Sequence, residues 1–123
     1  MAELSPVEQL TLDLTATIDD STRAPIDVIQ WFGARGIRMN GDNFTPLFNR
    51  KDIAKLLGNV NYRYFKPSRE IKAKSTGCTK TSRVSVMYCE VDLYRFIDYS
   101  KKDCDAKLTE AILKFMFEAK VRK

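Results

Sequence analysis

The sequence contains no histidine, and its three cysteines share no CxxC spacing. Without histidine, the commonest general base of enzymes and every Ser-His or Cys-His pair are missing. Cys78, Cys89 and Cys104 match neither a disulfide framework nor a zinc-ligand pattern, so we expect reduced thiols and no structural metal. No glycine-rich phosphate-binding motif is present either. These absences favour a binding protein over an enzyme and predict no cofactor.

Long hydrophobic runs are also missing. No apolar stretch approaches the roughly 20 residues that a membrane-spanning helix needs. The first ten residues, MAELSPVEQL, lack the basic region and apolar core of a signal peptide. With 123 residues, of which 44% are hydrophobic, the chain can bury a proper core. We therefore expect a single intracellular domain over residues 1–123 that has no membrane partner.

Charge is distributed very unevenly along the chain. The net charge is +5, yet the first thirty residues hold six acidic side chains and one basic side chain. Between Arg50 and Arg83, ten basic residues are opposed only by Asp52 and Glu70. Concentrated basic charge with tyrosines and asparagines among it favours a polyphosphate partner. The competing interpretation is a solvated charged surface that only keeps the protein soluble.

Hydrophobic periodicity predicts the elements of the N-terminal part. Leucines that alternate with polar residues over 10–14 indicate a half-buried strand. Pro25 suits the first turn of a helix, which Gly33 or Gly36 would end. A short strand is expected over 37–39, within a turn-rich region.

The central segment predicts two helices joined by a tight turn. Residues 44–48 lead into a helix that Asn49 caps and Gly58 ends. A second short helix is expected over 62–65, because an asparagine precedes it and a proline follows it. The result would be a helix–turn–helix-like unit with its basic residues exposed.

The remaining elements are two strands and two helices. Strands over 71–75 and 84–88 predict a β-hairpin with Lys80 at its basic tip. An apolar stripe over 93–97 indicates one helix. A longer amphipathic helix follows, with apolar residues at Leu108, Ala111, Ile112, Phe115, Met116 and Ala119. The predicted fold is α+β, a single small domain with a helix–turn–helix-like unit, a basic hairpin and a C-terminal amphipathic helix.

Four motifs occur in a distinctive order over residues 44–123. They are DIAKLLG from Asp52, an acid at Glu90 before LYRFI, the run SKK from Ser100, and a closing VRK from Val121. In this order the sequence resembles the Bro-N domain, related to the KilA-N group of DNA-binding domains in large DNA viruses and phages. The family commonly has a tryptophan in its last helix and ends in IRK, and this chain departs from it at both places.

The resemblance implies DNA binding in a viral regulatory or replication-associated protein, located in the host nucleus or cytoplasm. It covers about two-thirds of the chain, and the acidic part over residues 1–43 has no counterpart in it.

The candidate nucleic-acid contacts share a basic, amide or phenolic side chain. They are Arg50, Lys51, Lys55, Asn59, Asn61, Tyr62, Arg63, Lys66, Arg69, Lys72, Lys74, Lys80 and Arg83. Arg63 is suited to read guanine, and Asn59 or Asn61 to read adenine, although both asparagines are equally good helix caps. The residues expected to touch phosphates, which position a protein without specifying a sequence, are Lys66, Lys72, Lys74, Lys80 and Arg83.

Tyr62 and Tyr64 are two positions apart, so on a helix they cannot face the same way. We expect one of them to be buried with Phe65 and the other to face the nucleic acid.

Two other functions compete with binding of double-stranded DNA. RNA is the first, because the charge argument does not separate the two nucleic acids. The second is a protein-interaction or assembly module. In that case the acidic N-terminal segment would meet the basic segment of another copy, for instance in a homodimer, or would lie over the basic surface of its own chain.

Overall fold

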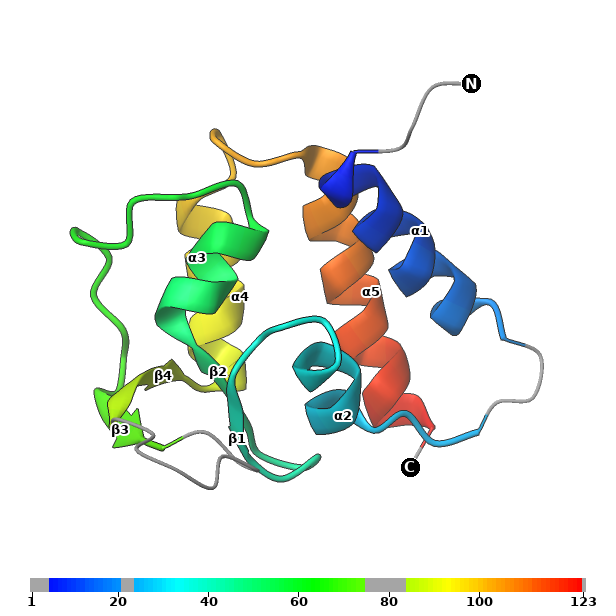
Figure 1. Cartoon of the computed structure of the whole chain (residues 1–123), viewed down its shortest axis with the longest axis horizontal. Helices are drawn as coiled ribbons and strands as arrows, with labels where there is room; N and C mark the ends of the chain where they lie inside the picture. The colour runs from blue at the N-terminus through cyan, green and yellow to red at the C-terminus, as the bar shows by residue number, and fades with distance from the viewer. Residues whose placement is uncertain (1–4, 21–23, 75–83, 123) are drawn as a thin grey trace.

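The computed structural model describes residues 5–20, 24–74 and 84–122 of the chain. Within these ranges five helices accompany a four-stranded antiparallel sheet (Figure 1). The predicted α+β class is therefore confirmed. None of the helices in the described ranges has the length and apolar character needed to cross a membrane.

The first element is helix α1 (Pro6–Ile18), where the sequence predicted a strand. Ser5 caps it through a hydrogen bond of 3.1 Å from the Glu8 amide, and proline follows at the first helical position. Leu14 is fully buried, whereas Leu12 is 52% exposed. The strand prediction was wrong because alternating leucines concealed a helical stripe, made of Val7, Leu10, Leu14 and Ile18.

Helix α2 (Val28–Gly33) is shorter than predicted, because Asp27 is its N-cap and Pro25, expected in the first turn, lies before the helix. The Asp27 carboxylate accepts a hydrogen bond of 3.0 Å from the Gln30 amide. After the helix, Gly36 adopts a positive φ of 89°, a conformation that suits glycine. The chain then enters strand β1 (Met39–Gly41), close to the predicted short strand.

Strand β2 (Pro46–Asn49) was not predicted; residues 44–48 were expected only to lead into a helix. It has only four residues, and it is defined as a strand by its pairing with one neighbouring strand on each side. The strand order is β1-β2-β4-β3, with β3 (Ile71–Ala73) and β4 (Ser85–Tyr88) forming the predicted antiparallel pair. The expected basic tip at Lys80 lies outside the described residues.

Helix α3 (Arg50–Leu56) follows β2 directly and has the predicted cap at Asn49. Gly58 ends it as expected, with a φ of 105°, and Asn59 follows with a φ of 61°. These two left-handed residues turn the chain sharply.

The second short helix, predicted over 62–65, is absent from this described segment, so the helix–turn–helix-like unit was a wrong prediction. The Asn61 side chain accepts a hydrogen bond of 2.9 Å from the Arg63 amide, which closes a turn instead of capping a helix. The Phe65 amide then donates to the Tyr62 carbonyl at 3.1 Å in a second turn. Pro67 leaves too few residues for a helix to continue, because it disfavours helical geometry at the residue before it.

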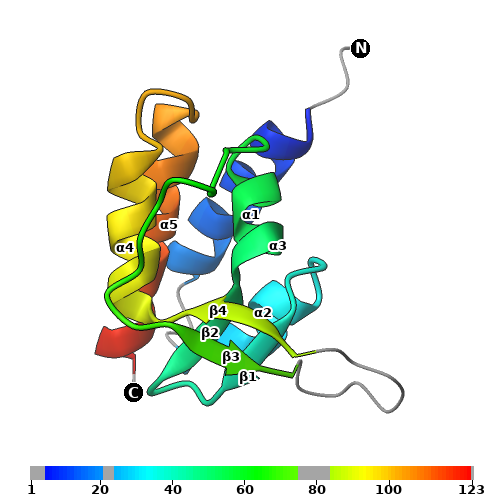
Figure 2. The same ribbon diagram turned by 90° about the vertical axis from the view of Figure 1, so that its left-hand side faces the viewer.

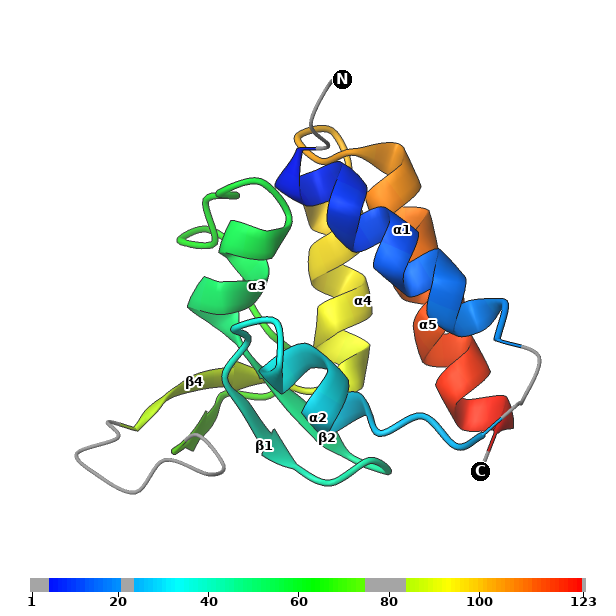
Figure 3. The same ribbon diagram turned by 45° about the vertical axis from the view of Figure 1, so that its right-hand side comes forward.

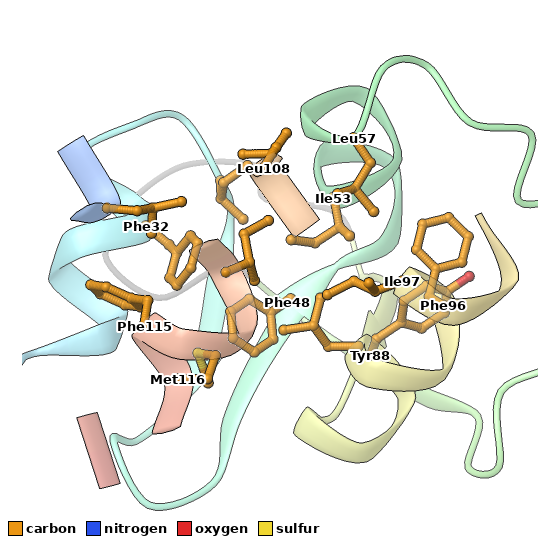
Figure 4. Close-up of a cluster of buried hydrophobic side chains, with 14 of the residues drawn as sticks. Phe32, Phe48, Ile53, Leu57, Tyr88, Phe96, Ile97, Leu108, Phe115 and Met116 are labelled. Atoms are coloured by element: carbon orange, nitrogen blue, oxygen red, sulfur yellow. The ribbon is translucent and has the colours of Figure 1, made fainter. Parts of the chain in front are cut away.

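The C-terminal helices α4 (Glu90–Tyr99) and α5 (Ala106–Val121) agree with the predicted stripes. Helix α1 packs along α5, as Figure 3 shows. The core is rich in aromatic side chains, and Figure 4 shows Phe48 between the Phe32 and Phe115 side and the Tyr88 and Phe96 side. The rings of Phe32 and Phe48 meet edge to face at 5.3 Å. The predicted burial of Phe115 and Met116 is confirmed.

Candidate nucleic-acid interface

The site begins at the junction of β2 and α3, where the Asn49 side chain is fully buried. Its oxygen accepts hydrogen bonds from the Lys51 amide at 3.0 Å and the Asp52 amide at 3.1 Å. Its nitrogen donates to the Ser85 hydroxyl at 2.8 Å. One side chain therefore caps α3 and fixes the start of that helix against β4.

This junction opens into a pocket of about 420 Å³, here called the basic pocket. Its lining residues are Asn49, Arg50, Lys51, Lys72, Val84, Ser85 and Val86. Three of the predicted contacts, Arg50, Lys51 and Lys72, thus come together from α3 and β3. Figure 2 shows why: the sheet places β3 and β4 beneath the start of α3.

The cations of the basic pocket are held to different degrees. The Arg50 guanidinium lies 4.8 Å from the centre of the Tyr62 ring, a cation–π contact that restrains it. Lys51 is exposed to solvent. Lys72 approaches Glu70 at 3.9 Å, and because both side chains are exposed this ion pair contributes little. The two lysine ammonium groups therefore remain accessible to an anion.

Asp52, one of the two acids in the basic segment, is engaged by Arg38. The Arg38 guanidinium donates to both carboxylate oxygens, at 2.9 and 3.2 Å, and the Arg38 backbone amide donates at 2.8 Å. This bidentate pair balances the charge of Asp52 with a base from outside the segment. Asp52 therefore reduces the positive potential around Lys51 and Lys55, which share one face of α3, only slightly.

A buried carboxylate, Asp92 of α4, anchors the loop that leads to β3. It accepts hydrogen bonds from the Ser68 amide at 2.8 Å, the Ser68 hydroxyl at 2.7 Å and the Arg69 amide at 3.3 Å. Arg95 adds an ion pair at 3.1 Å. Burial alone would raise the pKa of Asp92, but these hydrogen bonds outweigh it and lower the pKa below its usual value. The loop is therefore clamped to α4 by a charged group.

The two tyrosines face different ways, as expected. Tyr62 is half-buried beneath Arg50, whereas Tyr64 is 75% exposed. Phe65 packs on the core, 5.4 Å from the Tyr88 ring and 5.0 Å from the Phe96 ring. Burial raises the pKa of Tyr88 to about 12, so this phenol stays protonated at physiological pH.

The other predicted contacts do not line the basic pocket. Asn59, Asn61 and Arg63 are exposed on the turns after α3, where neither asparagine caps a helix. Lys66 lies on a different face, beside α4. Arg69 and Lys74 are exposed near the ends of β3. Lys80 and Arg83 are outside the described residues.

Sequence reasoning missed the side chains that position this site. Asn49 was recognised as a cap, but its bond to Ser85 needs the β2–β4 pairing, which no local pattern indicates. Neither Asp92 nor Arg95 was among the candidate residues. A carboxylate between two apolar residues at a helix start was the only available signal.

The acidic N-terminal part does not cover the basic pocket in the described ranges. Helix α1 lies against α5, on the side of the molecule away from β3 and β4 (Figures 1 and 3). Buried Arg122 secures it there, donating to the Thr17 carbonyl at 3.2 Å and the Ile18 carbonyl at 2.6 Å. Arg122 of the closing VRK motif thus links α5 to the end of α1.

Over residues 5–20, 24–74 and 84–122, no cluster of three cysteine or acidic side chains could hold a metal ion. Cys89 and Cys104 are free thiols there, and Cys78 lies outside those ranges.

No protein-family model, curated protein or solved structure matches the chain. The resemblance to the Bro-N domain therefore rests on the order of its four motifs and stays a prediction.

Proposed function

We propose that this chain is a nucleic-acid-binding domain that grips double-stranded DNA through the basic pocket and the neighbouring exposed lysines. The observation that carries the proposal is the convergence of Arg50, Lys51 and Lys72 from two separate elements. Neutralising phosphates releases condensed counterions, so clustered cations generate affinity that scattered cations do not.

The roles within this surface follow from side-chain chemistry. Lys51 and Lys72 act as mobile point charges on phosphates, and Lys55 and Lys74 extend their reach along α3 and β3. Arg50 is pre-oriented by the Tyr62 ring, which lowers the entropy lost when it binds a phosphate. Such contacts position a duplex without reading its sequence. The domain acts by binding and not by catalysis.

The proposed function agrees with the role implied by the Bro-N resemblance, in a viral regulatory or replication-associated protein. The proposed mode of binding differs from the expected one, because the turns over 59–65 offer no recognition helix for the major groove. The start of α3 and the antiparallel β3–β4 pair are the elements presented instead.

Binding of a labelled duplex by the variant Lys51→Gln/Lys72→Gln tests this proposal. At about 50 mM salt, loss of two phosphate contacts should weaken binding roughly 10- to 100-fold. The matched control is Lys101→Gln/Lys102→Gln, which removes the same charge from the exposed turn between α4 and α5, at the far end of α4 from the sheet. Equal losses for both variants would contradict the proposal, because they would reflect net charge alone. Duplex RNA of the same sequence, tested in parallel, decides between the two nucleic acids.

A second candidate, a homodimer, is favoured by a separate observation on α5. Leu113, Phe117 and Val121 are exposed and recur every four residues, so they form an apolar stripe on one face of the helix. A two-fold interface uses the same patch on both copies, so a second copy supplies a matching apolar surface. Sedimentation of the wild type against Phe117→Ser, across a concentration series, tests this candidate. A monomer at all concentrations for both proteins would remove it.

A further inference from the structure

A second pocket lies on the face formed by α4 and the loop that follows α3. Its volume is about 590 Å³, and we call it the aromatic pocket. Its lining residues are Tyr64, Phe65, Lys66, Tyr94, Arg95, Asp98 and Tyr99. Figure 2 shows the loop running alongside α4, where the Asp92 anchor holds it.

The wall of the aromatic pocket is held in place by contacts behind it. The Tyr99 ring stacks on Phe96 with 6.0 Å between centroids and also contacts Phe65 at 5.4 Å. Its hydroxyl donates to the Asn61 carbonyl at 3.3 Å, which braces the loop against α4. An aromatic surface held from behind in this way is available for stacking without further ordering.

Tyr64 stands apart from this packed group. It is 75% exposed and, in the described part of the chain, contacts no other aromatic ring. An exposed aromatic ring next to packed aromatic side chains is well placed to stack on a planar ligand.

The polar groups of the aromatic pocket indicate which planar ligand fits. Lys66 and Arg95 supply positive charge for a phosphate, and Arg95 is steadied by Asp92 at 3.1 Å. The exposed carboxylate of Asp98 can accept a hydrogen bond from an exocyclic amino group. Stacking surface, cation and acceptor together match a nucleotide. A cationic ligand such as a methylated lysine would be repelled by the two basic side chains.

The two pockets are close to each other along the chain. Arg50 lines the basic pocket and lies over Tyr62, which is two residues from Tyr64 in the same loop. We propose that the aromatic pocket binds an unpaired nucleobase, stacked on Tyr64, in a nucleic acid whose duplex part lies on the basic pocket. This inference rests on the proposed function and assigns the domain to junctions between duplex and single strand.

The test compares a blunt duplex with the same duplex carrying an overhang of about six deoxycytidines, whose bases carry an exocyclic amino group, at the length scale of single-strand binding sites. The wild type should bind the overhang form more tightly, by about 5- to 150-fold, the range that corresponds to one stacked base. Tyr64→Ala should abolish that gain without weakening binding to the blunt duplex, whereas Tyr64→Phe should retain it. Because Tyr64 is exposed, both variants should melt at the wild-type temperature.

Photo-crosslinking adds a readout of position. With 5-iododeoxycytidine in the overhang, the crosslinked peptide should contain Tyr64. A blunt duplex that binds with no gain from the overhang, or a gain that survives Tyr64→Ala, would overturn the inference and leave the proposed function standing. Failure of both forms to bind would overturn the proposed function and the inference together. A trimethyllysine peptide that binds at Tyr64, seen by chemical-shift perturbation, would also overturn the inference.

Discussion

The Asn49 amide donates a hydrogen bond of 2.8 Å to the Ser85 hydroxyl and thereby joins the start of α3 to β4. Asn49 also accepts the first amides of α3, so one buried group sets both the helix and its distance from the sheet. Since Arg50 and Lys51 follow immediately, their placement opposite Lys72 depends on this bond.

The first prediction concerns that bond. Asn49→Ala removes the cap and leaves the Ser85 hydroxyl without its partner, so it should destabilise the protein by about 2–4 kcal/mol. Asn49→Asp keeps the acceptor for the α3 amides but cannot donate to Ser85, and its cost should be smaller. Urea unfolding measures both. A cost below about 0.5 kcal/mol for Asn49→Ala would show that α3 needs no such anchor.

A second prediction uses two phenylalanines on the same helix. Phe115 is fully buried against Trp31 and Phe32, with its ring 4.6 Å from the Trp31 ring, whereas Phe117 is 66% exposed. Phe115→Ala should cost roughly 3–5 kcal/mol and the buried Leu108→Ala roughly 2–5. Phe117→Ala is the matched control and should stay within about 0.5 kcal/mol of the wild type. Similar melting temperatures for the two phenylalanine variants would mean that α5 is not part of the core.

The third prediction is a pH dependence set by Asp92. Its folded-state pKa is lowered, so its contribution to stability is present above the unfolded value of about 3.9 and is lost as the pH falls through the folded value. Asp92→Asn should lose about 2–4 kcal/mol at pH 7, because the amide presents a donor to surrounding donors. It should also show a shallower loss of stability below about pH 4. Asp98→Asn, an exposed acid on the same helix, should change neither property.

The parts of the fold that sequence predicts well are those with long periodic patterns. The apolar stripe from Leu108 to Ala119 predicted α5, and the alternation over 84–88 predicted β4. Each pattern repeats often enough to favour one secondary-structure period over the other. Helix α1 was misread because Leu10 and Leu14 fit both periods, whereas Leu12, which is exposed, fits only the strand period. Packing on α5 decides between the two. Strand β2 carries too few residues to show any period.

The candidate site, like the fold, was predictable only in part. The basic residues could be found from charge alone, but which of them meet depends on long-range pairing. Lys72 joins Lys51 because β3 pairs with β4 and β4 with β2, while Lys66, closer in sequence to Lys72, faces another pocket. The second helix expected over 62–65 failed because Asn61 closes a turn with Arg63, a local bond that competes with helix formation.

The salt dependence of duplex binding is the most direct test of the central claim, that the basic segment grips phosphates through the basic pocket. With on the order of five contacts, a plot of log affinity against log salt should have a slope of about −5 for the wild type. Lys51→Gln/Lys72→Gln should flatten that slope by about two units, whereas Lys101→Gln/Lys102→Gln should leave it unchanged. A slope near zero for the wild type, or one that the Lys51 and Lys72 changes do not alter while the fold stays intact, would contradict the account.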